Sequence, residues 1–216
     1  MIWILTPSER ELRALMEGLS PSVYSSTLCA STGVGAVATL HHLWHLWQGE
    51  RPRACIVVGI AGSYRKELRP PTLVYVQGET WGDLGKRLAR KFSPTPLELR
   101  GDFPLRIRSG PPPPFLSIPI VEGLTLHSVS GTAREARFWY RSYPYVSIET
   151  QENAAYFLFA QTHRLPLLSF RIISNQVGHR LWFFAEALEA LRTFASAHVA
   201  PLCEWLMGAN SPSYPG

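Results

Sequence analysis

A helix followed directly by a strand, in residues 147–178, is the feature of this chain that most restricts its fold. The residues after Glu152 form an apolar run that predicts a buried helix, and the Arg-Leu-Pro sequence at 164–166 ends it. Residues 167–173 predict a buried apolar strand, which stops at Ser174 and Asn175. Because open α/β folds build sites where buried elements end, Glu152 and Asn175 are candidate site residues. Ordinary turn chemistry explains an asparagine at position 175 equally well.

Strands alternate with helices along the rest of the chain. The other predicted strands are residues 2–5, 29–34, 54–62, 72–77 and 124–130. One predicted helix begins after a capping Ser8, and two more cover residues 36–47 and 181–207. This alternation indicates an α/β fold with a mostly parallel sheet. We expect one domain over residues 1–208, with a proline-rich excursion at about 86–119 and a tail at 209–216.

The composition limits the classes of protein to which the chain can belong. With 216 residues, 46% of them hydrophobic, it is long enough for one well-packed domain. The net charge of +5 is spread without a lysine–arginine block, so we expect a small-molecule ligand and no nucleic acid. No segment reaches the roughly 18 apolar residues of a membrane span. The three cysteines lie far apart and the N-terminus has no signal-peptide pattern, which predicts a cytoplasmic protein that does not bind membranes.

The sequence predicts neither a metal nor a cofactor. The Gly33-Val34-Gly35 turn lacks the third glycine and the later ribose-binding acid of a dinucleotide site. His41 and His45 are four residues apart on a predicted helix, but no third ligand is near them in the sequence. The same helix carries Trp44 and Trp47, and it is a better candidate for packing or for contact with a second subunit.

Several motifs in a fixed order give the chain a resemblance to a known family. They are Glu11 after a first strand and turn, GVGAVAT at 33–39, VVGIAGS at 57–63, and QENAA followed by RIISN. This set resembles the nucleoside phosphorylase/nucleosidase superfamily, which implies a three-layer α/β/α sandwich around a mixed, mostly parallel sheet. ETWGDLG at 79–85 and the C-terminal ISNQVGHRLWFFAEALEAL are similar to futalosine hydrolases, relatives of the methylthioadenosine/S-adenosylhomocysteine nucleosidases. The resemblance implies an enzyme that cuts the N-ribosidic bond of futalosine, giving hypoxanthine and dehypoxanthinylfutalosine in menaquinone biosynthesis.

The resemblance also implies a role for three polar residues. Glu11 matches the carboxylate that activates the attacking water, Glu152 the one that binds the ribose hydroxyls, and Asn175 the residue that faces N7 of the base. Cleavage builds positive charge on the sugar and negative charge on the leaving purine, so a placed water, a grip on the sugar and a donor to N7 are all needed. The further substrate-binding candidates are Gln151, Ala61, Gly62, Ser174, Arg180 and Trp182. For the last two, helix entry and core packing are the alternative explanation.

The side chain at position 175 carries information about the base. Adenosine-type relatives have an aspartate there, whose protonated carboxyl matches the acceptor and the donor that adenine presents. Hypoxanthine presents two acceptors, N7 and O6, and a neutral carboxamide directs N–H donors at them without a pKa shift. Asn175 therefore favours a 6-oxopurine. Gln151, Ile60 and a shortened segment at 131–144 depart from the family pattern, which bears on the substrate rather than on the bond that is cut.

Two other functions stay open at this point. A purine nucleoside phosphorylase would use phosphate in place of water, but the Thr6-Pro7-Ser8 turn offers no glycine-rich cradle and Glu11 would repel the anion. A non-catalytic nucleoside-binding protein on the same fold would not need all three polar roles. Related enzymes are dimers or larger, so we expect a homodimer or larger homo-oligomer that meets through the excursion and the helix of Trp44 and Trp47.

Overall fold

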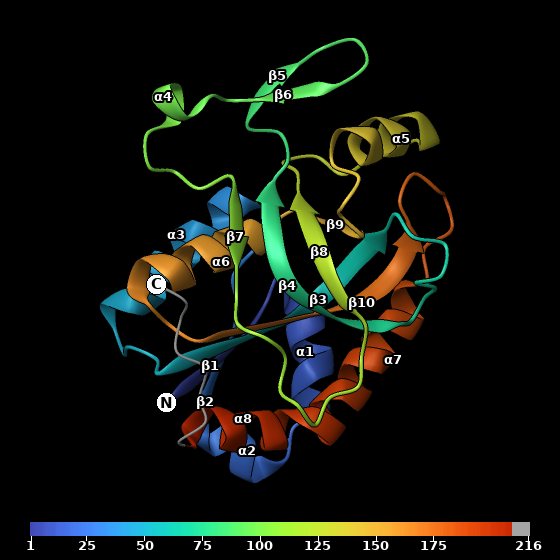
Figure 1. Ribbon diagram of the computed structural model, residues 1–216. Helices are drawn as coiled ribbons and strands as arrows, with labels where there is room; N and C mark the ends of the chain where they lie inside the picture. The colour runs from blue at the N-terminus through green and yellow to red at the C-terminus, as the bar shows by residue number, and fades with distance from the viewer. Residues whose placement is uncertain (209–216) are drawn as a thin grey trace.

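A mixed sheet with helices packed on it makes up the part of the chain that the computed structural model describes, residues 1–208 (Figure 1). The predicted tail at 209–216 lies outside the described residues. The strands of the main sheet are β1 (Ile2–Thr6), β2 (Thr27–Ser31), β3 (Ala54–Ser63), β4 (Leu73–Trp81), β7 (Arg106–Arg108), β8 (Ile120–Thr125), β9 (Ile148–Thr150) and β10 (Leu167–Gln176). The helices are α1 (Glu9–Gly18), α2 (Pro21–Ser26), α3 (Ala36–Gln48), α4 (Leu97–Arg100), α5 (Ala133–Ser142), α6 (Asn153–His163), α7 (Phe184–Phe194), the π-helical turn η1 (Ala195–Val199) and α8 (Ala200–Met207).

The main sheet closes on itself. Its strand order is β10-β4-β8-β9-β3-β1-β2, and β10 also pairs with β3, so β3, β10, β4, β8 and β9 form a ring. Strand β3 pairs in parallel with β1 and β10, and β8 in parallel with β4 and β9, whereas β4–β10 and β3–β9 are antiparallel. The predicted α/β class and mixed sheet are confirmed. The arrangement differs from the predicted three-layer sandwich, because these strands curve into a barrel with β1 and β2 as its extension.

Both faces of the central strands are covered, which explains their apolar sequences. On β1, Ile2 and Ile4 join the cluster formed with α1, α7 and α8, while Trp3 and Leu5 join the cluster formed with α3 and α6. Successive residues of a strand point to opposite faces, so a strand covered on both sides is apolar at every position. The continuous apolar run of β3 has the same cause.

Helix α1 begins where the sequence predicts. Ser8 is its N-cap, and the Ser8 hydroxyl accepts a hydrogen bond from the backbone N–H of Glu11. A carboxylate in the first turn is favoured by the helix dipole. Glu11 nevertheless faces inward, on the same side of the helix as the buried Ala14 and Leu15. The cap and the apolar face of α1 together point the carboxylate into the molecule.

Strand β10 is longer than predicted, and several other elements also have different bounds, among them β2 at 27–31 for the predicted 29–34 and β4 at 73–81 for the predicted 72–77. The apolar stretch ends at Ile173, but pairing with β3 carries the strand through Asn175 to Gln176, with a shift of register between Ile173 and Asn175. The strand predicted at 124–130 is β8 at 120–125. Its first residue, Ile120, is exposed, and pairing with β4 rather than burial places it in the strand. The helix predicted at 181–207 begins at Phe184.

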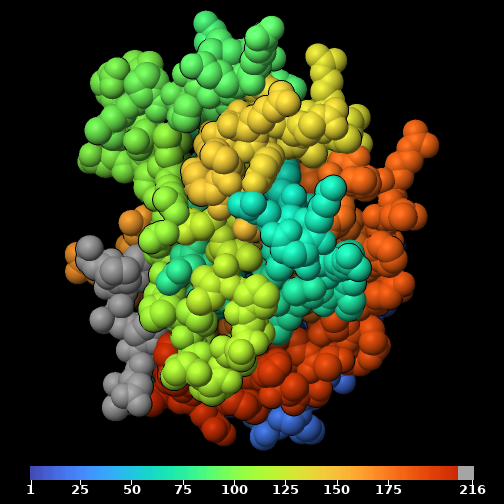
Figure 2. Space-filling model, turned by 45° about the vertical axis from the view of Figure 1, so that its right-hand side comes forward, coloured from blue at the N-terminus to red at the C-terminus, as the bar shows by residue number. Residues whose placement is uncertain are grey.

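The excursion at 86–119 contains short elements. Strands β5 (Gly85–Arg87) and β6 (Phe92–Pro94) form a separate hairpin, and β7 pairs with β4. Figure 2 shows the green hairpin segment standing at the top of the molecule beside the gold α5. The proline-rich end of the excursion returns along the body, where Leu116 and Ile118 pack against the core cluster of α7 and α8. Within residues 1–208, no helix has the length and apolar character that a membrane span requires.

Candidate active site

Glu11 is a buried carboxylate held between α1 and β3. Its Oε1 accepts a hydrogen bond from the backbone N–H of Ile60 at 2.9 Å, and its Oε2 accepts one from the Ser8 hydroxyl. A Cβ atom at position 59 would lie 3.0 Å from Glu11 Oε1, so Gly59 leaves room for this approach. Burial raises the pKa of Glu11, and the hydrogen bonds from Ser8 and Ile60 oppose that rise.

Glu152 is a second buried carboxylate in the same region. It follows β9 and caps the N-terminus of α6, which packs on the sheet from the side opposite to α1. Its Oε1 lies 3.5 Å from the Arg171 guanidinium Nη2. Burial raises the pKa of Glu152 to about 7; Arg171 lowers it, and the charge of Glu11 raises it further. The negative charge of Glu11 therefore acts on the ionisation of Glu152.

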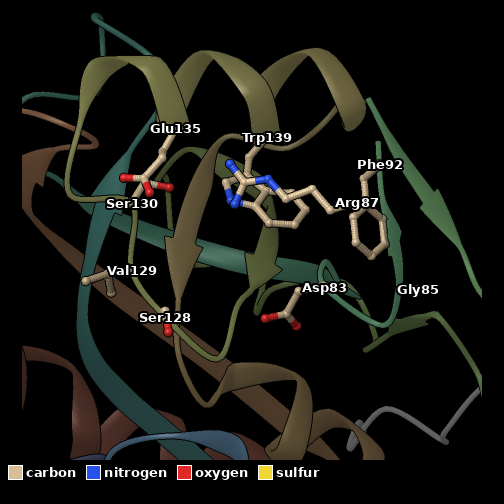
Figure 3. Close-up of a pocket in the computed structure, with 9 residues that line it drawn as sticks. All are labelled: Asp83, Gly85, Arg87, Phe92, Ser128, Val129, Ser130, Glu135 and Trp139. Atoms are coloured by element: carbon tan, nitrogen blue, oxygen red, sulfur yellow. The ribbon is translucent and has the colours of Figure 1, made fainter. Parts of the chain in front are cut away.

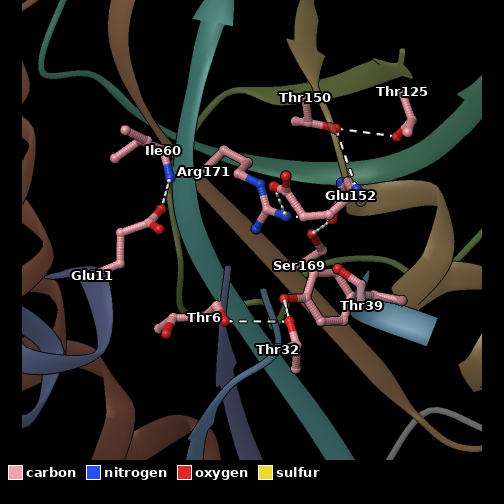
Figure 4. Close-up of polar contacts among 12 residues, drawn as sticks. Thr6, Glu11, Thr32, Thr39, Ile60, Thr125, Thr150, Glu152, Ser169 and Arg171 are labelled. Atoms are coloured by element: carbon pink, nitrogen blue, oxygen red, sulfur yellow. Dashed lines mark hydrogen bonds and ion pairs between the residues drawn. The ribbon is translucent and has the colours of Figure 1, made fainter. Parts of the chain in front are cut away.

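Arg171 lies between the two glutamates and contacts Glu152. Its side chain is completely buried on β10, and Figure 4 shows the guanidinium between Glu11 and Glu152. Nη2 donates to Asn153 Oδ1 at 2.8 Å, and Nη1 donates to the carbonyl oxygen of Phe170 at 3.0 Å. The positive charge lowers the pKa of both glutamates. Arg171 thus favours the ionised form of each carboxylate against the effect of burial.

Arg171 was not among the residues predicted for the site. The signal that could have found it is a single arginine inside the otherwise apolar run of residues 167–173. An arginine is almost never fully buried unless it is paired. A charged residue in a strand that must be covered on both faces therefore predicts a buried acidic partner, although it does not say which one.

Asn175 lies near the end of β10, next to Gly62 of β3. The two residues are paired in register, and a Cβ at Gly62 would lie 3.4 Å from the Asn175 Nδ2. The amide oxygen accepts a hydrogen bond from the Ser174 hydroxyl at 3.0 Å, and Nδ2 donates to the Gln176 carbonyl at 3.2 Å. The Ser174 hydroxyl also contacts the carbonyl oxygen of Ala61 at 3.3 Å. Four predicted residues therefore meet at this strand end, and Asn175 is partly exposed there.

Glu11 and Asn175 contact the same strand, β3, at two different positions. Glu11 is bonded at Ile60 and Asn175 lies beside Gly62, two residues further along the same strand. A strand rises by about 3.3 Å per residue, which puts these two positions roughly 7 Å apart along β3.

Of the other predicted residues, Gln151 directly precedes Glu152, whereas Arg180 and Trp182 lie beyond the end of β10. The amide of Gln151 donates to the carbonyl oxygen of His127 at 3.1 Å. Arg180 is exposed, and Trp182 is 61% exposed with its ring 4.8 Å from that of Phe184. The structure does not bring Arg180 or Trp182 to Glu11 or Glu152, so substrate contact by these two residues stays a prediction.

A cavity of about 280 Å³ lies between α5, the β5–β6 hairpin and the loop before α5 (Figure 3). Its lining residues are Asp83, Gly85, Arg87, Phe92, Ser128, Val129, Ser130, Glu135 and Trp139. Ser130 also bonds, through its N–H and its hydroxyl, to the carboxylate of Glu149 at 2.7 Å each, and Glu149 pairs with Gly62. The cavity therefore adjoins the Asn175 end of the site, although none of the predicted residues lines it.

The described residues offer no cluster of metal ligands. In residues 1–208, no three His, Cys, Asp or Glu side chains lie close enough together to hold a metal ion. The rings of His41 and His45 are 4.5 Å apart on α3, without a third side chain of this kind beside them in the described part of the chain.

Comparisons with known proteins give one sequence relative and many similar structures. No family model matches the chain. A futalosine hydrolase from Streptomyces coelicolor is 31% identical over 166 residues, which cover 71% of this chain and 68% of that protein. The structure of a futalosine hydrolase mutant from Helicobacter pylori has a TM-score of 0.77 at 14% identity, over 94% of this chain and 98% of that chain. A Streptococcus pneumoniae methylthioadenosine/S-adenosylhomocysteine nucleosidase in complex with 8-aminoadenine has a TM-score of 0.70 at 16% identity, over 90% and 99%. These structures share the fold.

Proposed function

The chain belongs to the futalosine hydrolase family, and on that basis we propose that it is a purine nucleosidase whose substrate is futalosine. Hydrolysis of the N-ribosidic bond releases hypoxanthine and leaves dehypoxanthinylfutalosine. The observation that carries the proposal is the pair of buried carboxylates, Glu11 and Glu152, that face one guanidinium, Arg171. Such a pair supplies both a base for water and an anionic partner for the sugar.

Glu11 is the general base of this mechanism. Its carboxylate takes a proton from a water molecule as the water oxygen attacks the anomeric carbon of the ribose. The hydrogen bonds from Ile60 and Ser8 hold each carboxylate oxygen in place and leave further lone pairs for the water. Arg171 supports the ionised form that a base requires.

Glu152 holds the ribose. An ionised carboxylate accepts hydrogen bonds from the sugar hydroxyls, and such charge-assisted bonds are stronger than those between neutral groups. Its negative charge also stabilises the positive charge that builds on the sugar as the bond to the base breaks. The 3.5 Å contact with Arg171 keeps the carboxylate in one position.

Asn175 binds the base. Its Nδ2 carries two N–H groups, and the contact with the Gln176 carbonyl uses one of them. The second N–H is available for N7 or O6 of a 6-oxopurine. A donor at this point stabilises the negative charge that the leaving purine acquires. Ala61, Gly62 and Ser174 form the neighbouring wall, since Ser174 bonds to Ala61 and Gly62 lies under the Asn175 amide.

The decisive experiment is an assay of the purified protein with futalosine, inosine, adenosine and methylthioadenosine. Chromatography of the free base gives the rate for each substrate. We expect hypoxanthine from futalosine at the highest rate. Adenine as the main product, from either adenosine-type substrate, would contradict the assignment of the base, and binding without any free base would indicate a non-catalytic nucleoside-binding protein.

Repeating the assay with and without phosphate separates hydrolysis from phosphorolysis. Attack by water leaves a hydroxyl group on the anomeric carbon of the sugar product, whereas a phosphorylase leaves a phosphate group on that carbon. We expect a rate and a product that do not depend on phosphate, because Glu11 would repel the phosphate anion at the point of attack.

A homodimer or larger homo-oligomer is part of the proposal. On α3, Val37 is 72% exposed and Trp44 is 57% exposed, and Leu99 of α4 in the excursion is 76% exposed. Trp47 is half-buried, and its ring packs edge-on against that of Trp3 at 6.5 Å, so Trp44 is the more exposed tryptophan of this helix. Light scattering of the wild type and of the Trp44→Glu variant tests this surface: we expect the variant to shift towards the monomer.

A further inference from the structure

Glu79 on β4 is a completely buried carboxylate that the proposed reaction does not use. Its Oε1 accepts a hydrogen bond from the Thr125 hydroxyl at 2.9 Å, and its Oε2 accepts one from Asn153 Nδ2 at 2.7 Å. A Cβ atom at Gly123 of β8 would collide with Oε2, so the neighbouring strand leaves space for the carboxylate. Because a buried carboxylate is unfavourable for folding by itself, its place beside the site calls for an explanation.

The Asn153 amide connects Glu79 with the site. Its Nδ2 points to Glu79, and its Oδ1 accepts hydrogen bonds from Arg171 Nη2 at 2.8 Å and from the Ser169 hydroxyl at 3.0 Å. An amide can turn over and exchange its donor and acceptor ends. Glu79 Oε2 accepts a hydrogen bond from the N–H end of the amide, and this bond keeps the amide oxygen facing Arg171.

Arg171 depends on this orientation. If the amide were turned over, two N–H donors would face the guanidinium, which also carries donors only. Nη2 would lose its partner at 2.8 Å, and the guanidinium would move relative to Glu152, which lies 3.5 Å from the same atom. A chain of buried contacts therefore runs from Glu79 through Asn153 and Arg171 to Glu152.

We propose that Glu79 is a positioning residue for the nucleosidase reaction, which fixes the Asn153 amide and so aims Arg171 at the carboxylate that holds the ribose. This inference rests on the proposed function, because it assigns the ribose hydroxyls to Glu152. Glu79 itself touches neither the sugar nor the base. Its effect on the reaction is specific to the sugar hydroxyls.

The test compares futalosine with its 2′-deoxy analogue, which lacks one hydroxyl that Glu152 binds. The quantity measured is the ratio of kcat/KM for the two substrates. The Glu79→Met variant keeps the approximate shape of the side chain and removes its oxygens. We expect this variant to lower the ratio by about tenfold, since one hydrogen bond to a charged group contributes that much discrimination. The Glu79→Gln variant, whose amide oxygen can still accept from Asn153, should keep the ratio of the wild type.

The matched control is Glu149→Met. Glu149 is also a buried glutamate at a strand end, and it binds Ser130 and Tyr64 rather than the contacts that lead to Arg171. Its removal should affect the two substrates alike. An unchanged ratio in Glu79→Met, with kcat/KM equally reduced on both substrates, would show that Glu79 only stabilises the fold and would overturn the proposal.

A second variant covers the case in which Glu79→Met does not fold. Asn153→Asp replaces the amide by a carboxylate that attracts Arg171 away from Glu152, so the same fall in the ratio is expected. A wild-type ratio in this variant would likewise refute the role of Asn153. Failure of the proposed function is visible separately, because the wild type would then cleave neither substrate. A crystal structure of the folded variant gives a readout independent of activity: the proposal requires that the Arg171–Glu152 distance changes.

Discussion

Arg171 and Glu152 form a buried ion pair with 3.5 Å between Nη2 and Oε1, and their strand and helix belong to the same part of the chain. Residues 147–178 thus supply both charges, one at the start of α6 and one in the middle of β10. Glu11, from the other end of the chain, approaches the same guanidinium. Arg171 therefore acts on one carboxylate from the N-terminal part of the chain, Glu11, and on one from the C-terminal part, Glu152.

Replacement of Arg171 by Met should lower both activity and stability. Removal of one partner of a buried pair leaves an uncompensated charge and costs about 3–5 kcal/mol. Urea unfolding of the Arg171→Met variant measures this loss of stability. The kcat/KM with futalosine should fall by at least about a hundredfold, which corresponds to about 2–3 kcal/mol of lost transition-state stabilisation. Adding Glu152→Gln to this variant should recover part of the stability and none of the activity. Recovery of activity in the double variant would contradict the role given to the pair.

Replacement of Glu11 by Gln should remove catalysis and keep the fold. The glutamine oxygen can still accept from the Ile60 N–H, and its amide can donate to Ser8, so the local hydrogen bonds persist. A positioned general base contributes about 10² to 10⁴ in rate, and kcat should fall by that factor. Isothermal titration with futalosine should give nearly the wild-type affinity. A variant with full turnover would refute the assignment of Glu11.

The Asn175→Asp substitution should change the choice of base. Asn175 has one N–H free for N7 or O6, whereas an aspartate must be protonated to donate at all, so inosine and futalosine lose a partner while adenosine gains an acceptor for its amino group. An unpaired buried group costs about 1–3 kcal/mol, which corresponds to a roughly ten- to hundredfold shift in relative kcat/KM. The assay is the competition of inosine and adenosine in one mixture. An unchanged ratio would show that position 175 does not read the base.

Much of the fold follows from local sequence. The capping Ser8 predicts the start of α1, and the apolar runs of β3 and of residues 167–173 predict strands covered on both faces, all of which the structure bears out. Local pattern is sufficient there because the cap and the burial act on neighbouring residues. The motifs that resemble the nucleosidase family lie in the same segments.

The parts that could not be predicted depend on contacts between distant segments. The ring closes through the β3–β10 and β4–β10 pairings, which no run of apolar residues specifies. The start of β8 was missed because Ile120 is 53% exposed and is held by its partner strand. Arg171 was missed because its role depends on two glutamates, Glu11 and Glu152, that belong to other elements of the fold. The pattern of residues 147–178 indicated Glu152, and the family resemblance indicated Glu11, but neither indicated the arginine that lies between them.

The buried carboxylates should make the protein less stable as the pH rises. Burial raises the pKa of Glu152 from 4.5 to about 7 and that of Glu79 from 4.5 to about 8. Above pH 4.5 the folded chain therefore binds more protons than the unfolded chain, so the free energy of unfolding falls from about pH 4.5 up to the folded-state pKa values of about 7 and 8 and levels off above them.

The Glu152→Gln variant isolates one of these contributions. It lacks the ionisation at position 152, so its free energy of unfolding should fall less between about pH 5 and pH 8, by roughly 2–3 kcal/mol at 1.36 kcal/mol per unit. Urea unfolding at several pH values in this range measures the slope. Glu50→Gln, a substitution at an exposed position, is the control and should follow the wild type. If Glu152→Gln also followed the wild type, Glu152 would not be protonated on folding, and the ribose-binding carboxylate would already be ionised at acidic pH.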